Sequence, residues 1–225
     1  DMPMRQLPFA AKCAVASSSG DAFLTADGEF TARVGKKSLT IDTSKLKIKG
    51  LHNSYNAMAA ALATMAAGVE PEQVAESLYD FSPVEHRLEP AGERDGVEWI
   101  NDSKATNVDS VWYALESMTR PVVWIAGGTD KGNDYEPLKP FARQKVKALV
   151  CMGVDNEKLI REFTGVVPNV VSCSSLEEAM QSAKSLAESG DTVLLSPACA
   201  SFDLFKSYEH RGRLFKEWVE ENVLK

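Results

Sequence analysis

The feature that most constrains the fold is a regular alternation of apolar and amphipathic segments from Val97 to the end of the chain. Five short runs of mainly valine, isoleucine, leucine and alanine recur at a spacing of about 25 residues, which leaves room for one helix after each. They predict strands at 98–101, 122–126, 148–152, 170–173 and 192–196. Helices are predicted at 108–117, 137–145, 156–163, 176–188 and 205–222. This order is typical of an α/β fold with an open, doubly wound and mostly parallel sheet.

The residues before Pro83 follow a different pattern. Two β-prone runs flank Asp27-Gly28, a dipeptide that favours a two-residue hairpin turn because both positions tolerate positive φ. The hairpin strands are predicted at 22–26 and 29–34, with 12–16 and 38–41 as possible flanking strands. This part therefore begins as a small β-structure.

Two helices are predicted after this hairpin. The first is an alanine- and methionine-rich segment at 53–67, with Asn53 as its expected N-cap. Pro71 is expected to open the second, at 71–79. We place a domain boundary after Phe81-Ser82-Pro83, which gives domains at 1–84 and 85–225.

Composition narrows the class of protein. The 225 residues carry 25 lysines and arginines against 32 aspartates and glutamates, a net charge of −7. This balance argues against binding to nucleic acid or to a membrane surface. No apolar run approaches the length of a membrane span and no leader precedes Leu7, so we expect a cytoplasmic protein. The four cysteines form no CxxC pair, which disfavours a zinc site or a disulfide framework.

Three of the five predicted strands run into segments rich in small and polar residues, at 101–107, 127–132 and 196–203. Any one of them alone would be interpreted as a polar turn with a helix cap. Because the carboxyl ends of parallel strands meet at one edge of a sheet, three such segments together indicate a binding site. Their glycines, hydroxyls and cations suit a phosphate or carboxylate ligand.

Several common sites are excluded by their missing motifs. The sequence has no GxGxxG after a strand and no GxxxxGK[ST], so it supports neither a dinucleotide site nor a P-loop within these residues. It also has no HExxH metal motif and no GxSxG nucleophile elbow. Hydrolase chemistry is therefore disfavoured.

Five ordered segments between about residues 47 and 215 resemble the Mur ligase family, and within it the D-glutamate-adding ligases. They are Gly-Leu-His-Asn-Ser-Tyr-Asn-Ala-Met-Ala-Ala at 50–60, His86-Arg87, Asn-Asp-Ser-Lys-Ala-Thr-Asn at 101–107, the glycine loop ending in Lys131, and 196–205. The Asp-Asn-Pro-Arg signature of the lysine- or diaminopimelate-adding relatives is missing.

The resemblance implies a domain assignment and an activity. Residues 1–84 resemble the C-terminal portion of the central ATP-binding domain, and 85–225 the Rossmann-like C-terminal domain. The family joins D-glutamate to UDP-N-acetylmuramoyl-L-alanine in peptidoglycan precursor synthesis, through acyl phosphate and tetrahedral intermediates, with ATP and Mg²⁺. The family's P-loop and magnesium ligands belong upstream of Asp1, so we expect this chain alone to be inactive, and we expect a monomer.

The resemblance also assigns site residues, none of them a catalytic group or a metal ligand. Nucleotide contacts are expected from Asn53, Asn56, His86, Arg87, Asp102 and Lys104. D-glutamate contacts are expected from Thr106, Lys131, Ser201 and Tyr208. Cys199 is expected to be structural, and His210, Arg211 and Arg213 to form a solvated helix face.

Three alternative functions remain open at this point. The chain could belong to another amino-acid-adding Mur ligase, to a ligase similar to folylpolyglutamate synthase, or to a non-catalytic module that binds a nucleotide or an amino acid. Assays of amino-acid specificity separate the first two from the D-glutamate-adding ligases.

Overall fold

The computed structural model describes residues 9–10, 22–25, 27–48, 50–82 and 84–225. The chain divides into two compact units, Asp1–Pro83 and Val84–Lys225, called unit 1 and unit 2 below. The flanking strand expected at 12–16 lies outside the described residues. The assignment of the two units to particular domains of the Mur ligase family stays a prediction.

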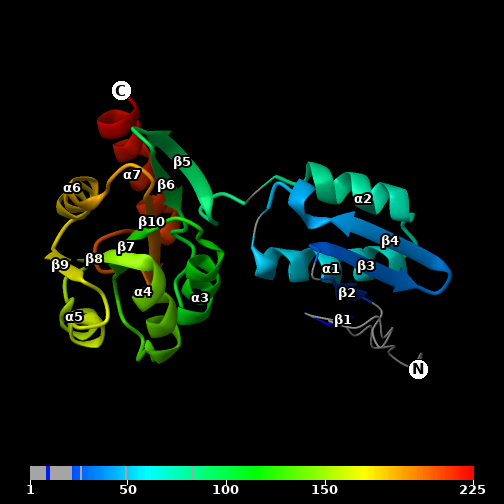
Figure 1. Ribbon diagram of the computed structural model, residues 1–225, viewed down its shortest axis with the longest axis horizontal. Coiled ribbons are helices and arrows are strands. Elements are labelled where there is room, and N and C mark those ends of the chain that lie inside the picture. The colour runs from blue at the N-terminus through cyan, green and yellow to red at the C-terminus, as the bar shows by residue number, and fades with distance from the viewer. Residues whose placement is uncertain (1–8, 11–21, 26, 49, 83) are drawn as a thin grey trace. The chain divides into compact units, whose positions relative to one another are not determined.

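Unit 1 pairs a four-stranded sheet with two helices (Figure 1). The strands are β1 (Phe9–Ala10), β2 (Ala22–Leu24), β3 (Glu29–Val34) and β4 (Lys37–Asp42), in that order across the sheet, and a 3-10 turn follows at Thr43–Lys45. The helices are α1 (Leu51–Ala66) and α2 (Pro71–Asp80). The predicted hairpin is confirmed, since β2 and β3 pair antiparallel across a turn in which Gly28 has φ 83°.

The predicted N-cap of the first helix is wrong. Helix α1 begins at Leu51 with Gly50 as its N-cap, so Asn53 lies inside the first turn. Gly50 has φ 91° and ψ 151°, a conformation that side chains disfavour, and this glycine lets the chain enter the helix two residues early. The amide N–H of Asn53 donates to the Gly50 carbonyl at 3.1 Å, within the hydrogen-bonding of the helix start.

Unit 2 contains a six-stranded sheet in the order β5-β6-β10-β7-β8-β9. All neighbouring strands run parallel except β5, which is antiparallel to β6. The strands are β5 (Glu89–Arg94), β6 (Val97–Asn101), β7 (Val122–Gly127), β8 (Val146–Met152), β9 (Asn169–Cys173) and β10 (Thr192–Ala198). The expected α/β fold with a mostly parallel sheet is confirmed.

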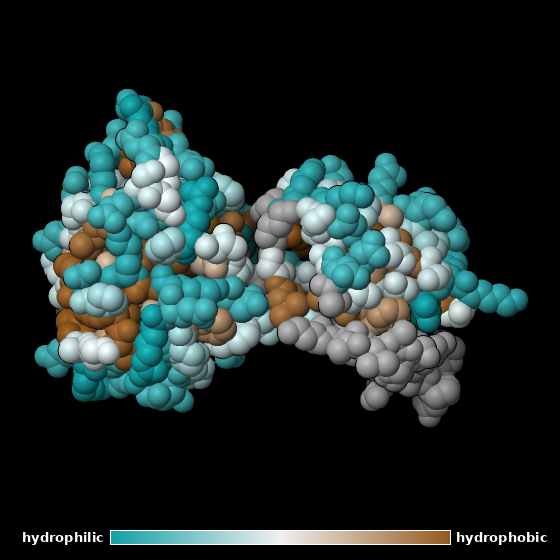
Figure 2. All heavy atoms as spheres, in the orientation of Figure 1, coloured by the Kyte–Doolittle hydropathy of each residue, from teal (hydrophilic) through white to brown (hydrophobic). Residues whose placement is uncertain are grey.

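Helices cover both faces of this sheet, and each face has its own apolar core (Figure 1). On one face lie α3 (Val108–Ser117), α4 (Lys139–Lys145, after a 3-10 turn at Glu136–Leu138) and α5 (Glu157–Phe163). On the other lie α6 (Leu176–Leu186) and α7 (Tyr208–Val219), and a π-helical turn follows at Glu220–Leu224. In the described part of the chain, no helix is both long and apolar enough to cross a membrane. Hydrophilic residues cover most of the face drawn in Figure 2.

Two elements of unit 2 differ from the sequence prediction. Strand β5 was not predicted, although Asp95 and Gly96, with φ 54° and 80°, form the same Asp-Gly hairpin signal used for unit 1. The last helix begins at Tyr208 rather than Phe205, because the Ser207 hydroxyl caps it by accepting from the His210 amide at 3.2 Å. Phe205 instead packs in the core.

The position of β10 makes the chain diverge at the carboxyl edge of the sheet. Chain leaving β6 and β7 passes to α3 and α4 on one face, whereas chain leaving β10 passes to α7 on the other. Loops that diverge in this way leave a crevice beyond the strand ends, the usual ligand site of open α/β sheets. The three polar segments of the sequence follow these three adjacent strands.

The loop after β7 depends on a glycine that other residues fit poorly. Gly128 has φ 125°, and a Cβ atom built on it would lie 2.1 Å from the Ala200 carbonyl oxygen. We expect Gly128→Ala to lower the free energy of unfolding by about 3 kcal/mol, from backbone strain and this contact together. Chemical denaturation would measure it.

Gly132→Ala is the matched control. Gly132 also has positive φ, at 87°, but its Cβ position is open. This variant should lose about 1 kcal/mol, the cost of the backbone conformation alone. Equal losses in the two variants would contradict the close approach between the loops after β7 and β10.

Candidate functional site

Eight of the ten predicted site residues belong to unit 2, and two belong to unit 1. Asn53 and Asn56 lie on α1, where Asn53 is half-buried and Asn56 is exposed. His86 and Arg87 lie in the segment that enters unit 2. The other six follow the three strand ends or begin α7; they are Asp102, Lys104, Thr106, Lys131, Ser201 and Tyr208.

The loops after β7 and β10 are fastened together. Thr129 and Ala200 exchange two backbone hydrogen bonds, N–H to carbonyl at 2.8 Å one way and 3.2 Å the other. Ser201, which is 2% exposed, directly follows this bridge. Lys131 follows it on the other side and is exposed. The bridge therefore brings the predicted hydroxyl and cation to one part of the carboxyl edge of the sheet.

Asp130 holds the backbone beside Lys131. Its Oδ1 accepts from the amides of Gly132 at 2.6 Å and Asn133 at 3.0 Å, and its Oδ2 accepts from the Tyr135 hydroxyl at 2.7 Å. Burial alone would raise the pKa of Asp130, but hydrogen bonds from Tyr135 and Lys158 outweigh it and keep that pKa below its ordinary value. Lys131 thus projects from a loop braced by an ionised carboxylate.

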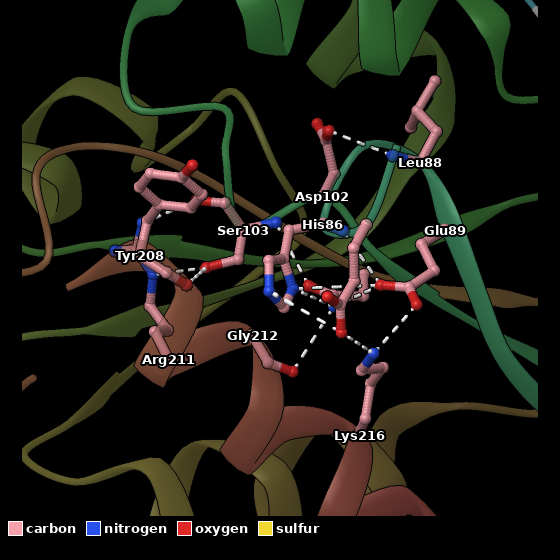
Figure 3. Close-up of polar contacts among 11 residues, drawn as sticks. His86, Leu88, Glu89, Asp102, Ser103, Tyr208, Arg211, Gly212 and Lys216 are labelled. Atoms are coloured by element: carbon pink, nitrogen blue, oxygen red, sulfur yellow. Dashed lines mark hydrogen bonds and ion pairs between the residues drawn. The ribbon is translucent and has the colours of Figure 1, made fainter. Parts of the chain in front are cut away.

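Asp102 is buried and bonded within its own unit. Its Oδ2 accepts from the Ser196 hydroxyl at 2.7 Å. Its Oδ1 accepts from the Leu88 amide at 3.2 Å, the contact drawn in Figure 3. Burial raises the pKa of Asp102 to about 7, although both hydrogen bonds and Arg87 lower it. The carboxylate thereby ties the entering segment to the ends of β6 and β10. A direct nucleotide contact stays a prediction.

His86 is 3% exposed and forms part of the fold. Its Nδ1 accepts from the Asn101 side-chain amide at 2.9 Å, and its ring lies edge-on to Tyr208 at 6.1 Å. Burial lowers the pKa of His86, so the imidazole is neutral. A Cβ atom on Gly212 would lie 2.3 Å from Nδ1, which shows how closely α7 packs on this ring. Arg87, by contrast, is exposed.

Within unit 2, the residues predicted for nucleotide and for D-glutamate are not separate in space. The Lys104 ammonium lies 5.3 Å from the centroid of the Tyr208 ring, a cation–π contact. The Lys104 amide donates to the His86 carbonyl at 3.0 Å, and the Thr106 amide donates to the Lys104 carbonyl at 2.9 Å. Tyr208 therefore packs against residues from the nucleotide group, and the half-buried Thr106 lies in the same loop.

Arg211 contradicts the solvated helix face expected for it, because its side chain is 0% exposed. Its guanidinium donates to the hydroxyl and carbonyl of Ser103 at 3.0 and 2.9 Å, and to carbonyls of Gly127 and Cys199 at 3.4–3.5 Å. The signal that could have revealed it is helical spacing, since Arg211 shares a face of α7 with the buried Phe215 and Trp218. Arg213 is exposed and His210 is half-buried.

One cluster in the described residues has the composition of a metal site. The ligand atoms of Glu85, His86 and Glu89 lie within 4.8 Å of one another. The Lys216 ammonium already pairs with Glu85 at 2.6 Å and Glu89 at 2.9 Å (Figure 3). Because this ammonium already occupies both carboxylates, the cluster does not fit Mg²⁺.

Comparison with known proteins identifies the family. The model described as "Mur ligase, glutamate ligase domain" matches residues 86–199, half of the chain. This chain belongs to the Mur ligase family. The resemblance found in the sequence is thereby confirmed.

Curated relatives carry a more specific name. The UDP-N-acetylmuramoylalanine--D-glutamate ligase of Christiangramia forsetii is 50% identical over 186 residues, covering 83% of this chain and 42% of that protein. The ligase of the same name from Porphyromonas gingivalis is 45% identical over 215 residues, covering 96% and 47%. The chain thus spans less than half the length of these relatives.

Solved structures share the fold at low sequence identity. MurF from Acinetobacter baumannii superposes with a TM-score of 0.66 at 17% identity, over 95% of this chain and 47% of that one. Folylpolyglutamate synthase from Mycobacterium tuberculosis, in complexes with ADP and AMPPCP, gives a TM-score of 0.63 at 14% identity, over 88% and 48%. The fold therefore does not distinguish among these ligases.

The raised pKa of Asp102 predicts a pH-dependent stability. The folded state binds this proton more tightly than the unfolded state, whose carboxyl has a pKa near 3.8. The stabilisation is therefore complete below pH 4 and is lost as the pH rises through about 7. We expect the difference in unfolding free energy between wild type and Asp102→Asn to shift in favour of the variant by up to about 4 kcal/mol over this range.

Asparagine can keep both hydrogen bonds at this position, because its oxygen accepts from the Leu88 amide and the Ser196 hydroxyl can reverse to accept. Denaturation at a series of pH values would test the prediction. A difference that stays constant from pH 4 to 8 would contradict the buried, protonatable state of Asp102.

Proposed function

We propose that this chain is part of an ATP-dependent ligase that joins D-glutamate to UDP-N-acetylmuramoyl-L-alanine, a step of peptidoglycan precursor synthesis. The observation that carries the proposal is the placement of Thr106, Ser201 and Lys131 after three neighbouring strands, β6, β10 and β7. The outer two of these strands, β6 and β7, are two strand spacings apart, about 10 Å. The names of the relatives at 45–50% identity support D-glutamate as the amino acid.

The proposed acceptor site suits a dicarboxylate. Lys131 supplies an exposed positive charge, and Thr106 and Ser201 supply hydroxyls that donate to carboxylate oxygens. Tyr208 forms a wall beside them, held by its contacts with Lys104 and His86. The role of these residues is to orient the amine of D-glutamate, because amide formation on an activated carboxylate depends mainly on positioning and charge stabilisation.

Some of the residues predicted to contact nucleotide have side chains suited to binding ATP. Arg87 is an exposed, permanently charged fork suited to phosphate, and Lys104 lies in the adjoining loop. His86 and Asp102 are already engaged within the unit, so we assign them to holding this segment in place. Asn53 and Asn56 offer amides suited to an adenine edge. ATP supplies the phosphoryl group that activates the carboxylate of UDP-N-acetylmuramoyl-L-alanine, and Mg²⁺ is assigned to residues outside this chain.

Further parts of the proposal follow from the same family membership. We propose a cytoplasmic, monomeric enzyme whose substrates are small molecules rather than nucleic acid or lipid. The rival amino-acid-adding ligases share the fold but are less supported, because the relatives with the higher identity share one name. A non-catalytic binding module is the remaining alternative. ADP release that depends on D-glutamate, in the full-length protein, separates all of these.

The first prediction from this proposal concerns Lys131. Charge-assisted hydrogen bonds contribute about 1.5–3 kcal/mol, so Lys131→Ala should raise the KM for D-glutamate about 10- to 150-fold. Ser201→Ala should raise it less, because a neutral donor is lost. Steady-state kinetics of the full-length enzyme, with each substrate varied separately, would measure both.

Lys184→Ala is the control for the loss of a positive charge. Lys184 lies on α6 beside Val97, at the start of β6 and so at the opposite edge of the sheet. Its KM for D-glutamate should equal that of wild type. If Lys131→Ala keeps a normal KM and turnover, the glycine loop is only a turn.

The second prediction concerns Arg87. Arg87→Ala should raise the KM for ATP about tenfold or more through the loss of a charged phosphate donor, with the KM for D-glutamate nearly unchanged. Arg143→Ala removes an exposed arginine from α4 and should change neither constant. An unchanged dependence on ATP in Arg87→Ala would overturn the nucleotide role of this arginine.

A further inference from the structure

Arg211 is the most completely buried charged side chain that the proposed mechanism does not yet use. It lies on the first turns of α7, three residues after Tyr208. Burial lowers its pKa to about 10, so the guanidinium remains charged at neutral pH. Burying such a charge is costly unless its donors are satisfied, so its surroundings are informative.

The partners of Arg211 come from the three loops at the carboxyl edge. Its Nε and Nη2 bond Ser103 after β6, at 3.0 and 2.9 Å (Figure 3). Its Nη1 reaches the Gly127 carbonyl at the end of β7, at 3.5 Å. Both terminal nitrogens reach the Cys199 carbonyl after β10, at 3.4 and 3.5 Å. One planar group thus contacts all three polar segments.

The loops held in this way are those that carry the proposed acceptor residues. Ser103 is three residues before Thr106, Gly127 is four before Lys131, and Cys199 is two before Ser201. Ser103 also donates its hydroxyl to the Tyr208 carbonyl at 2.8 Å, which links the same group to the fourth acceptor residue. A shift of the guanidinium would therefore move every residue of the proposed acceptor site.

The charge of Arg211 is balanced mainly by dipoles. Among the described residues, no carboxylate lies within ion-pair distance of its guanidinium. Asp203 attracts it only from farther away. Its carbonyl partners supply partial charges alone, so positive potential remains under the crevice, where low dielectric strengthens it. A ligand with two carboxylates is the kind of ligand that such a potential favours.

We infer that Arg211 is a positioning residue for the amino-acid acceptor: it fixes the three strand-end loops relative to one another and adds positive potential beneath the carboxylates. It does not touch the acceptor, since no part of it reaches the surface. The inference rests on the proposed function for the identity of the acceptor. The part of the inference that concerns the loops, namely that Arg211 holds them together, does not depend on the proposed function.

The kinetic test compares Arg211→Met with Arg211→Lys in the full-length enzyme. Methionine keeps much of the volume but loses charge and donors, whereas lysine keeps the charge and cannot reach all three loops. We expect Arg211→Met to raise the KM for D-glutamate about tenfold or more and Arg211→Lys to raise it less. Both should keep the KM for ATP within about twofold of wild type.

Arg213→Met is the matched control, because it removes the same charge from an exposed site two residues away. Its KM for D-glutamate should be unchanged. A normal KM in Arg211→Met, or an equal rise in the KM for ATP, would overturn the positioning role. Identical effects of methionine and lysine would overturn the role given to the charge.

Amide hydrogen exchange supplies a readout that does not depend on turnover. Arg211→Met should exchange faster than wild type at Thr129 and Ala200, whose amides bridge two of the fastened loops. Unchanged exchange would overturn the fastening. If wild type shows no turnover dependent on D-glutamate, the proposed function fails together with the acceptor role, and exchange still decides the fastening.

Discussion

The arrangement of unit 2 depends on one topological constraint, the insertion of β10 between β6 and β7. Three parallel strands then end side by side while their chains leave toward opposite faces of the sheet. Backbone carbonyl groups beyond these strand ends have no neighbouring strand to accept hydrogen bonds from. Because these groups are buried, they need hydrogen-bond donors from the protein itself. A single guanidinium from α7 serves three of the loops, and this explains why a cation lies where helix periodicity leads one to expect an apolar residue.

A second polar cluster anchors the start of the unit. Asp102, Asn101 and His86 are all nearly inaccessible to solvent, and each bonds to another element rather than to its own strand. Their environments fit this role, because burial lowers the pKa of His86, which keeps the imidazole neutral, and raises the pKa of Asp102 to about 7. The exposed Arg87 is thus carried by a segment fastened on both sides, through His86 and Leu88. A charge so placed loses little conformational freedom when it meets an anion.

The sequence predicts the five parallel strands of unit 2 and the sites of the helices because apolar period and spacing are local properties. It does not predict that β10 pairs with both β6 and β7, since pairing depends on contacts between distant residues. The burial of His86 and Arg211 has the same origin: each polar side chain looks solvated until the carbonyls and amides of other elements surround it. Strand β5 differs, because the Asp95-Gly96 turn that joins it to β6 is itself a local signal in the sequence.

The candidate site divides into residues that face solvent and residues that hold them. Arg87 and Lys131 are exposed cations, available to anionic ligands. Asp102 and Arg211 are buried and bond only within the unit. The same sequence motif contains both the residues that face solvent and the buried residues that hold them, so the motif alone does not tell the two kinds apart. Burial and hydrogen bonding distinguish the two kinds. The geometry of the loops depends on the buried Arg211 and Asp102 rather than on the exposed Lys131 and Arg87.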